Sequence, residues 1–170
     1  MNWNYLPAIP ADFAPDSRVW IYQSSRLLSM GEALHTEDLL NTFVENWKSH
    51  GTPVKGFGTL LFGQFIVLIA DENATGVSGC STDSSVRFVK QLEELFKVQL
   101  FDRQLLAFQV KDKVQLLPLS QLQHAVDHGF ISADTLYFNN LVQTKEELET
   151  KWMVPVKDSW LSRRIAITEK

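Results

Sequence analysis

The sequence has a single cysteine, Cys80, and no long apolar run. One cysteine cannot form an internal disulfide, and it does not build a thiolate zinc site without histidines beside it. The longest unbroken apolar run, Phe65–Ala70, has six residues, far short of the roughly 20 that a helix needs to cross a bilayer. We therefore expect no disulfide, no zinc–thiolate centre and no membrane span.

Neither charge sign is in large excess, since 16 Lys and Arg stand against 20 Asp and Glu, a formal net charge of −4. Such a chain has no strong field to draw it onto nucleic-acid phosphates or an anionic membrane, which disfavours a basic nucleic-acid binder. The first basic residue is Arg18 and prolines interrupt the start, so the pattern of a secretory signal is missing. We expect a cytoplasmic protein.

What the chain does have is apolar content for a core, with 45% hydrophobic residues, 11 Phe and 5 Trp in 170 residues. This composition indicates a folded chain and, at this length, one domain. Three prolines break any regular structure in residues 1–17, which we interpret as a proline-rich arm. We predict a single α+β domain over residues 18–170.

Hydrophobic periodicity and helix caps predict the order β-α-β-β-α-β, followed by β-α-β-α. The expected strands are 19–23, 57–62, 65–70, 105–110, 114–119 and 135–142, and the expected helices begin at Thr36, at Ser81 or Thr82, at Ser120 and at Thr144. Gly51 is expected to stop the first helix. The first six elements match the split βαβ, or ferredoxin-like, antiparallel arrangement, with the remaining four as a C-terminal extension.

Two of the expected strands, 19–23 and 65–70, are apolar on both faces, as central strands of a sheet are. A single layer of helices covers only one face, so the other face needs a second cover. The sequence leaves three sources open: the C-terminal segment with Trp152 and Trp160, the proline-rich arm, or a second copy of the chain in a homodimer.

A polar loop between strand 65–70 and the next helix is the most distinctive candidate site. Free backbone amides at a helix N-terminus, together with hydroxyl groups, suit a small anion. The expected ligand-binding residues are Gly76, Ser78, Gly79, Cys80, Ser81, Thr82, Asp83 and Ser84. The alternative interpretation is structural, with the hydroxyl residues capping the helix and the cysteine buried.

No complete catalytic set is evident, so the leading hypothesis is a non-catalytic binding or interaction domain with an unidentified small anion or protein as partner. The alternative is an enzyme that uses Cys80 as nucleophile, with His50 or His124 as base. His124 and His128 have the i, i+4 spacing of a metal-chelating pair, but a third ligand is not apparent and a solvated helix face is favoured. We expect no metal and no cofactor.

Two nucleotide-related patterns are incomplete. Gly51 and Gly56 have the spacing of P-loop glycines, but Phe57 and Gly58 stand where Lys and Ser or Thr are required, so no Walker A site is predicted. Residues 55–62 resemble the RNP1 pattern of RNA-recognition motifs, although Thr59 replaces a stacking aromatic. Binding of single-stranded RNA is a second alternative.

Five segments carry a resemblance to a known family: Val19–Tyr22, Ser78–Phe88, Leu100–Arg103, Phe138–Val142 and Trp152–Trp160. Together they resemble a small family of uncharacterised bacterial proteins whose members often carry the label "ABC transporter ATPase". The resemblance covers most of residues 18–165. It implies no established reaction, cofactor or site residue.

Because the amide cradle and its following lysine are missing, we predict that ATP with magnesium does not stabilise the protein. Specific binding to the native state would raise the melting temperature by mass action. The measurement is the melting temperature with and without millimolar ATP and magnesium. A clear rise would contradict the prediction.

Overall fold

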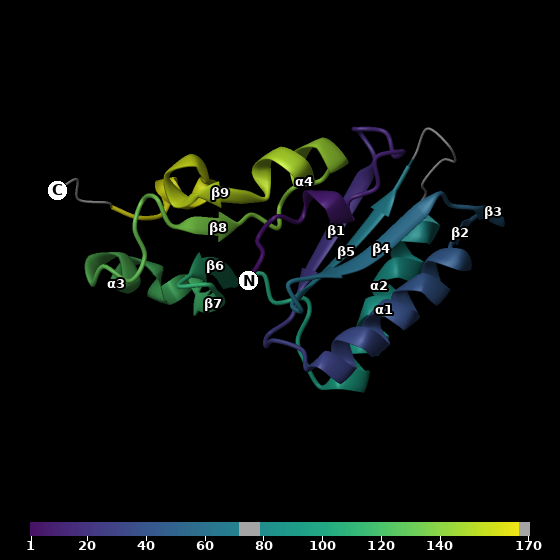
Figure 1. Ribbon diagram of the computed structural model, residues 1–170, viewed down its shortest axis with the longest axis horizontal. Coiled ribbons are helices and arrows are strands. Elements are labelled where there is room, and N and C mark those ends of the chain that lie inside the picture. The colour runs from purple at the N-terminus through teal and green to yellow at the C-terminus, as the bar shows by residue number, and fades with distance from the viewer. Residues whose placement is uncertain (72–78, 167–170) are drawn as a thin grey trace. The chain divides into compact units, whose positions relative to one another are not determined.

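The structure is a computed structural model that describes residues 1–71 and 79–166, without the side chains of residues 79–81 (Figure 1). The chain divides into two compact units. The N-terminal unit comprises Asn2–Phe101 and Asn140–Glu149, and the C-terminal unit comprises Met1, Asp102–Asn139 and Thr150–Lys170. Helices and antiparallel sheets confirm the α+β class. The expected single domain over residues 18–170 stays a prediction.

The N-terminal unit contains η1 Leu6–Ala8, β1 Arg18–Gln23, α1 Met30–Glu45, β2 Lys48–Ser49, β3 Thr52–Pro53, β4 Gly56–Leu61, β5 Phe65–Ala70 and α2 Gly79–Phe96. The C-terminal unit contains β6 Leu105–Val110, β7 Lys113–Pro118, η2 Leu119–Gln121, α3 Leu122–Asp127, β8 Leu136–Phe138, β9 Met153–Pro155, η3 Val156–Asp158 and η4 Trp160–Arg163. Helix α4, Lys145–Lys151, begins in the N-terminal unit. No helix among these is long and apolar enough to cross a membrane, in so far as the described residues go.

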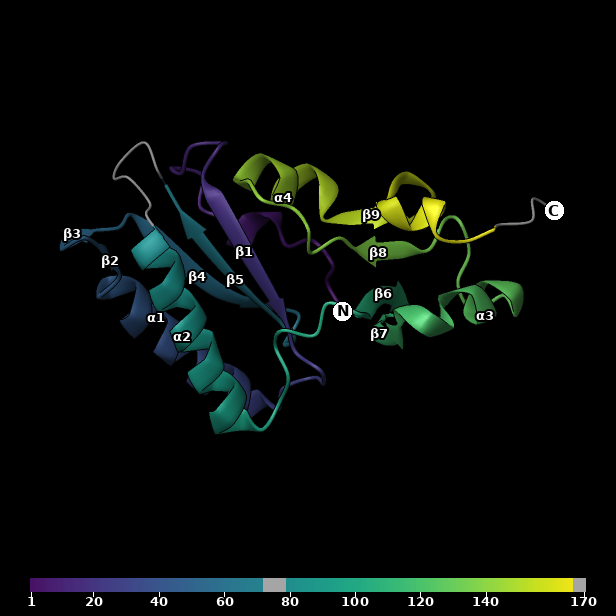
Figure 2. The ribbon, with the colours of Figure 1, turned by 180° about the vertical axis from the view of Figure 1, so that it is seen from behind.

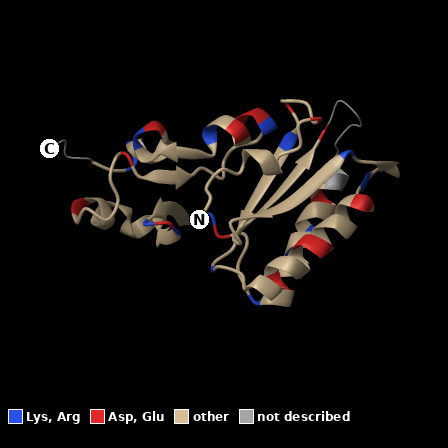
Figure 3. Ribbon diagram, viewed as in Figure 1, with Lys and Arg blue, Asp and Glu red and all other residues tan. Residues whose placement is uncertain are grey.

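Strand β5 is the centre of the N-terminal unit. It pairs with β1 on one side and β4 on the other, both antiparallel, in the order β1-β5-β4. All six of its side chains are at most 2% exposed, and neither β4 nor β5 carries a charged residue (Figure 3). The predicted adjacency of strands 19–23 and 65–70 is confirmed, and β5 is central and buried on both faces. The expectation that strand 19–23 is also central is wrong, because β1 lies at the edge of this sheet.

Helices α1 and α2 cover one face of this sheet (Figures 1 and 2). Leu40 of α1 and Val89 and Leu92 of α2 pack in one cluster with Ile66 and Leu68 of β5. This is the alternate set of β5 side chains, as expected for a pleated strand with one face toward the helices. The expectation that both helices lie on the same face is confirmed.

The proline-rich arm and the segment 140–149 cover the other face. Tyr5 and Phe13 of the arm are buried, and the Phe13 ring lies 6.4 Å from that of Phe57 on β4. The Tyr5 hydroxyl donates to the carbonyl of Leu148, which is fully buried. The chain therefore supplies both covers of β5 itself. Among the described residues of the N-terminal unit, the apolar face that was the physical reason to expect a homodimer is covered. The homodimer itself stays a prediction.

The ferredoxin-like arrangement is not confirmed, because its sixth element lies elsewhere. Residues 105–110 form β6, which pairs with β7 and β8 in a second sheet of order β7-β6-β8-β9. The place beside β1 is taken by another segment: Arg18 forms an antiparallel bridge with Thr144, and the Val19 amide donates to the Gln143 carbonyl. Hydrophobic alternation predicts a strand correctly here but does not say which sheet it joins.

The first helix begins earlier than predicted. Ser29, not Thr36, is its N-cap, and it forms a capping box in which Ser29 Oγ accepts from the Glu32 amide and Glu32 Oε1 accepts from the Ser29 amide. Thr36 is fully buried inside the helix, where its hydroxyl donates to the Glu32 carbonyl. The helix ends at Glu45, and Gly51 lies in the turn between β2 and β3 instead of stopping it.

Of the other predicted helix and strand boundaries, some are confirmed and others are wrong. Helix α2 begins at Gly79 and ends at Phe96, so Ser81 and Thr82 are inside it and do not cap it. Thr144 does cap α4, because its hydroxyl accepts from the Glu147 amide at 3.1 Å. The predicted strand 135–142 is reduced to β8, and the short strands β2, β3 and β9 were not predicted.

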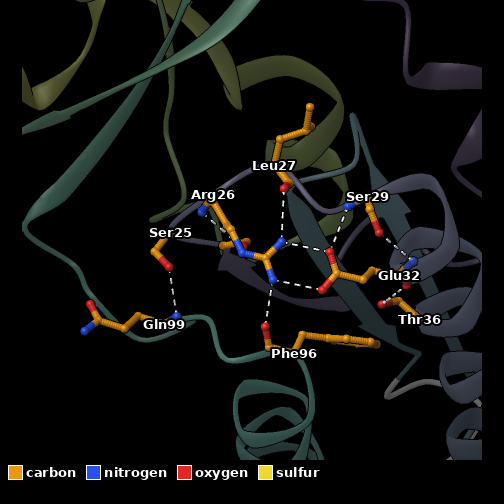
Figure 4. A network of polar contacts seen from close by, with 9 residues as sticks. Ser25, Arg26, Leu27, Ser29, Glu32, Thr36, Phe96 and Gln99 are labelled. Atoms are coloured by element: carbon orange, nitrogen blue, oxygen red, sulfur yellow. Dashed lines mark hydrogen bonds and ion pairs between the residues drawn. The ribbon is translucent and has the colours of Figure 1, made fainter.

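The carboxylate of Glu32 also joins three parts of the N-terminal unit (Figure 4). Arg26 pairs with both of its oxygens at 2.8 Å and donates to the carbonyl of Phe96 at the end of α2. The Arg26 and Ser29 hydrogen bonds hold the pKa of Glu32 below its usual 4.5, at about 2. The ionised carboxylate therefore favours the folded state.

We predict that Glu32→Gln lowers the melting temperature at neutral pH and removes part of its acid dependence. A depressed pKa stabilises the native state above the unfolded value of 4.5 and loses that effect as pH falls to about 2. Melting curves between pH 7 and pH 2 should show the gap between wild type and variant closing over this window. Glu94→Gln, at an exposed position of α2, is the matched control. A gap that stays constant down to pH 2 would contradict the prediction.

Candidate functional site

The predicted loop site is only partly within the described structure. Gly76 and Ser78 lie outside the described residues, and Gly79, Cys80 and Ser81 form the start of α2 without described side chains. Thr82, Asp83 and Ser84 continue the helix. The neighbouring Ser85 is fully buried and its hydroxyl donates to the Thr82 carbonyl at 2.7 Å, a contact within the helix.

The histidines proposed as partners of Cys80 lie in different settings. His50 is exposed in the turn between β2 and β3, with a positive φ of 50°. His124 belongs to α3 in the C-terminal unit. The cysteine-dependent reaction stays a prediction, because the thiol of Cys80 is outside the described side chains.

Four successive residues of the RNP1-like segment, 55–58, pack against other parts of the N-terminal unit. A Cβ added at Gly56 would lie 2.7 Å from the Trp47 ring, and one at Gly58 would lie 3.2 Å from Leu40, so both glycines allow close approach of α1 and the residues after it. Phe57 packs against the arm as described. Lys55 donates to the Asp12 carbonyl at 2.6 Å and lies over the Phe13 ring. The strand is an edge strand whose aromatic ring is turned to the protein's own arm.

One site with open space lies in the C-terminal unit. A pocket of about 580 Å³ lies between the β6–β7 hairpin, α3 and the residues that follow α3. We call it the hairpin pocket; its lining is Val110, Lys111, Gln115, Leu117, Gln121, His124, Ala125, His128, Gly129, Phe130 and Ile131. Ala125 and Ile131 are buried, whereas Lys111, Gln121 and both histidines are exposed. The pocket thus has an apolar floor and a polar rim.

A well-packed core supports this floor. Leu106 and Phe108 of β6, Leu122 of α3 and Tyr137 of β8 belong to one buried cluster. The Tyr137 hydroxyl accepts a hydrogen bond from Trp160 Nε1 at 3.2 Å, and burial raises the pKa of Tyr137 to about 12. The hairpin and α3 therefore share a common core beside the pocket.

Lys111 reaches the pocket from a strained two-residue turn. Lys111 and Asp112 connect β6 to β7 with φ of 50° and 61°, the left-handed region that favours glycine and asparagine. Asp112 pairs with the N-terminal amine of Met1 at 2.8 Å. In contrast, the Lys111 side chain makes no hydrogen bond or ion pair within the part of the chain that is described.

Three rings line one side of the pocket. The His124 and His128 ring centroids are 4.0 Å apart, and the His128 and Phe130 rings are nearly parallel, at 13° with centroids 6.5 Å apart. His128 Nδ1 lies 2.8 Å from the His124 carbonyl oxygen. A carbonyl only accepts, so Nδ1 carries the proton and Nε2 is left for other contacts. The Phe130 side chain is 70% exposed.

The charge of the lining is one-sided. It contains one lysine and two imidazoles, and none of its residues is Asp or Glu. Over residues 1–71 and 79–166, no three His, Cys, Asp or Glu side chains are grouped so as to hold a metal ion. The arrangement is suited to hold an organic molecule with an apolar body and an acidic group.

The sequence predicts several features that line this pocket, but it does not predict that they lie together. The two strands on either side of Lys111, 105–110 and 114–119, and the i, i+4 histidines are both predicted, as separate features. Two signals point to their proximity: Ser120 follows β7 almost directly, so α3 must pack near the hairpin, and Phe130 is an aromatic with no place in the helical stripe.

We predict that Lys111→Asn raises the stability of the protein by about 1 kcal/mol, because asparagine tolerates the left-handed region better than lysine. Thermal or urea unfolding measures this change. Lys113→Asn, two residues along the same hairpin but in strand β7, is the control and should lower stability, since asparagine disfavours strands. Equal effects of the two substitutions would speak against strain in the turn.

Comparison with known proteins gives no match: no family model, no curated protein and no solved structure matches this chain. The suspected family resemblance stays a prediction. The function is therefore argued from the site alone.

Proposed function

We propose that this chain is a non-catalytic binding protein that holds a small organic ligand in the hairpin pocket of its C-terminal unit. The observation that carries the proposal is the pocket itself, about 580 Å³ with a buried apolar floor and a polar rim. Pockets for small molecules have this volume range and this division between apolar walls and a few polar groups.

The polar groups of the rim are suited to binding. The side chains of Lys111 and Gln121 have no hydrogen bond or ion pair to any described residue, so both are open to a ligand. His128 is oriented by a backbone carbonyl, whereas a histidine that acts as general base is commonly oriented by a carboxylate. These features support retention of a ligand over its conversion.

The other functional expectations from the sequence stay predictions. An anion site at residues 76–85 is proposed only as a second site, and the cysteine-dependent enzyme remains its alternative. A cytoplasmic location and a homodimer are compatible with the proposed binding function. Single-stranded RNA has less support, because the RNP1-like strand packs against the arm.

Saturable binding of Nile red, a neutral apolar dye, tests the proposal. We predict that its fluorescence rises to a plateau with the wild-type chain and that Gln115→Trp, which places a large ring in the pocket from exposed strand β7, weakens binding at least about tenfold. Lys151→Trp, at an exposed position of the C-terminal unit outside the lining, is the control and should bind like wild type.

Two outcomes would overturn the proposal. One is the absence of saturable fluorescence with the folded wild-type chain. The other is equal weakening by both tryptophan substitutions, which would show that the dye does not bind in the hairpin pocket.

A further inference from the structure

We infer that the ligand of the hairpin pocket is an aromatic monocarboxylate, a planar ring system that bears one carboxylate group. This inference rests on the proposed function, because it names the chemical class that the same pocket takes. It is carried by three properties of the lining: the sign of its charge, the number of its charges and the arrangement of its rings.

The sign of the charge favours an acid. Lys111 is the single formal charge among the lining residues, and no carboxylate of the lining opposes it. Asp112, its neighbour in the turn, is held by the amine of Met1. The nearby Asp127 accepts a hydrogen bond from Gln123, and neither of these residues lines the pocket. An entering anion thus meets an ammonium group without a competing internal partner among the described residues.

The number of charges favours a monoanion. One ammonium group balances one carboxylate, whereas a phosphate monoester carries about −1.5 to −2 at neutral pH and suits clusters of basic residues. The remaining polar groups at the rim are hydrogen-bonding groups without a formal charge of their own in the count of the lining. They include the amide of Gln121 and, with Nδ1 committed to the backbone, Nε2 of His128.

The rings favour a planar aromatic body. Phe130 exposes 70% of its side chain at the rim, although a large apolar side chain is more stable when covered. Its plane is nearly parallel to that of His128, at 13°, so the two rings offer faces of the same orientation. A flat ligand stacks on such faces with offset geometry, which a saturated ring of the same volume does not achieve.

The floor and the volume agree with this class. Val110, Leu117, Ala125 and Ile131 supply an apolar surface below the rim. A volume of about 580 Å³ accommodates two fused rings with a carboxylate and leaves space for water at the polar rim. The carboxylate then lies toward Lys111 at the hairpin tip and the rings toward Phe130.

The test is displacement of Nile red by four matched probes: 2-naphthoate, neutral 2-naphthamide, the saturated decahydronaphthalene-2-carboxylate and 2-naphthyl phosphate. With the wild-type chain we expect naphthoate to bind about fivefold more tightly than naphthamide, the range of one partly exposed ion pair. It should also bind about fivefold more tightly than the saturated acid, and no less tightly than the phosphate.

Variants separate the two contributions. Lys111→Asn should bring the naphthoate-to-naphthamide ratio close to one and leave naphthamide affinity unchanged, which also shows that the variant is folded. Lys97→Asn is the control, since Lys97 is exposed, has a positive φ of 54° and belongs to the N-terminal unit. Phe130→Leu should remove the preference for naphthoate over the saturated acid.

The outcomes distinguish this inference from the proposed function. If Nile red binds and Gln115→Trp blocks it, but naphthoate and naphthamide displace it equally, the pocket stands and the acid is overturned. A phosphate that binds more tightly than naphthoate overturns the monoanion. If Lys97→Asn lowers the naphthoate preference as much as Lys111→Asn does, the charge effect is nonspecific and the assignment of Lys111 is overturned.

Discussion

Burial of β5 on both faces is the constraint on which the N-terminal unit depends. A six-residue strand with side chains at most 2% exposed requires apolar cover above and below, and one layer of helices supplies only one of these. The second cover comes from residues at distant sequence positions, the arm before β1 and the segment 140–149. The proline-rich arm is therefore a structural part of the unit and not a tail.

Charged groups hold the arm in place over the second face of β5. Asp71, 5% exposed at the end of β5, accepts a hydrogen bond from the Ala14 amide. Lys145, 7% exposed, donates to the Phe13 carbonyl at 2.9 Å and pairs with Glu149. Partly desolvated charges are costly without partners, so each of them favours one position of the arm over any other. Apolar contacts supply the attraction and these pairs supply the specificity.

Features that depend on a local sequence pattern, such as strands and helix caps, could be predicted from the sequence. Features that depend on contacts between distant residues could not. Two-sided apolarity identified β5 and its neighbour β1, and Thr144 was read correctly as a cap. The capping box of Ser29 escaped because the turn after it is exposed: Met30 is 81% and Leu34 64% exposed, so no apolar stripe marks the start of α1. Residues 105–110 were recognised as a strand, but a two-residue turn makes pairing with β7 local and cheap in chain entropy, which decides its sheet.

The candidate site was predictable only in fragments, for a related reason. A pocket is a property of surfaces that meet in space, and the hairpin, α3 and Phe130 meet through the shared core of Leu106, Leu122 and Tyr137. The loop at 76–85 stood out because its polar residues are contiguous in sequence. Residues that are adjacent in the sequence are easily recognised as a group, whereas residues that meet only in the folded structure are not.

The backbone strain at Lys111 differs from that at the other residues with positive φ. Within residues 1–71 and 79–166, three turns place two successive residues at positive φ, and two of them, at residues 50–51 and 62–63, use glycine at the second position. The turn at 111–112 has no glycine, so both of its residues carry strain. Lys97 also has positive φ, but it follows a helix, where a cation is favoured by the helix dipole. If the hairpin pocket binds an anion as proposed, the contact between Lys111 and that ligand offsets part of this backbone strain.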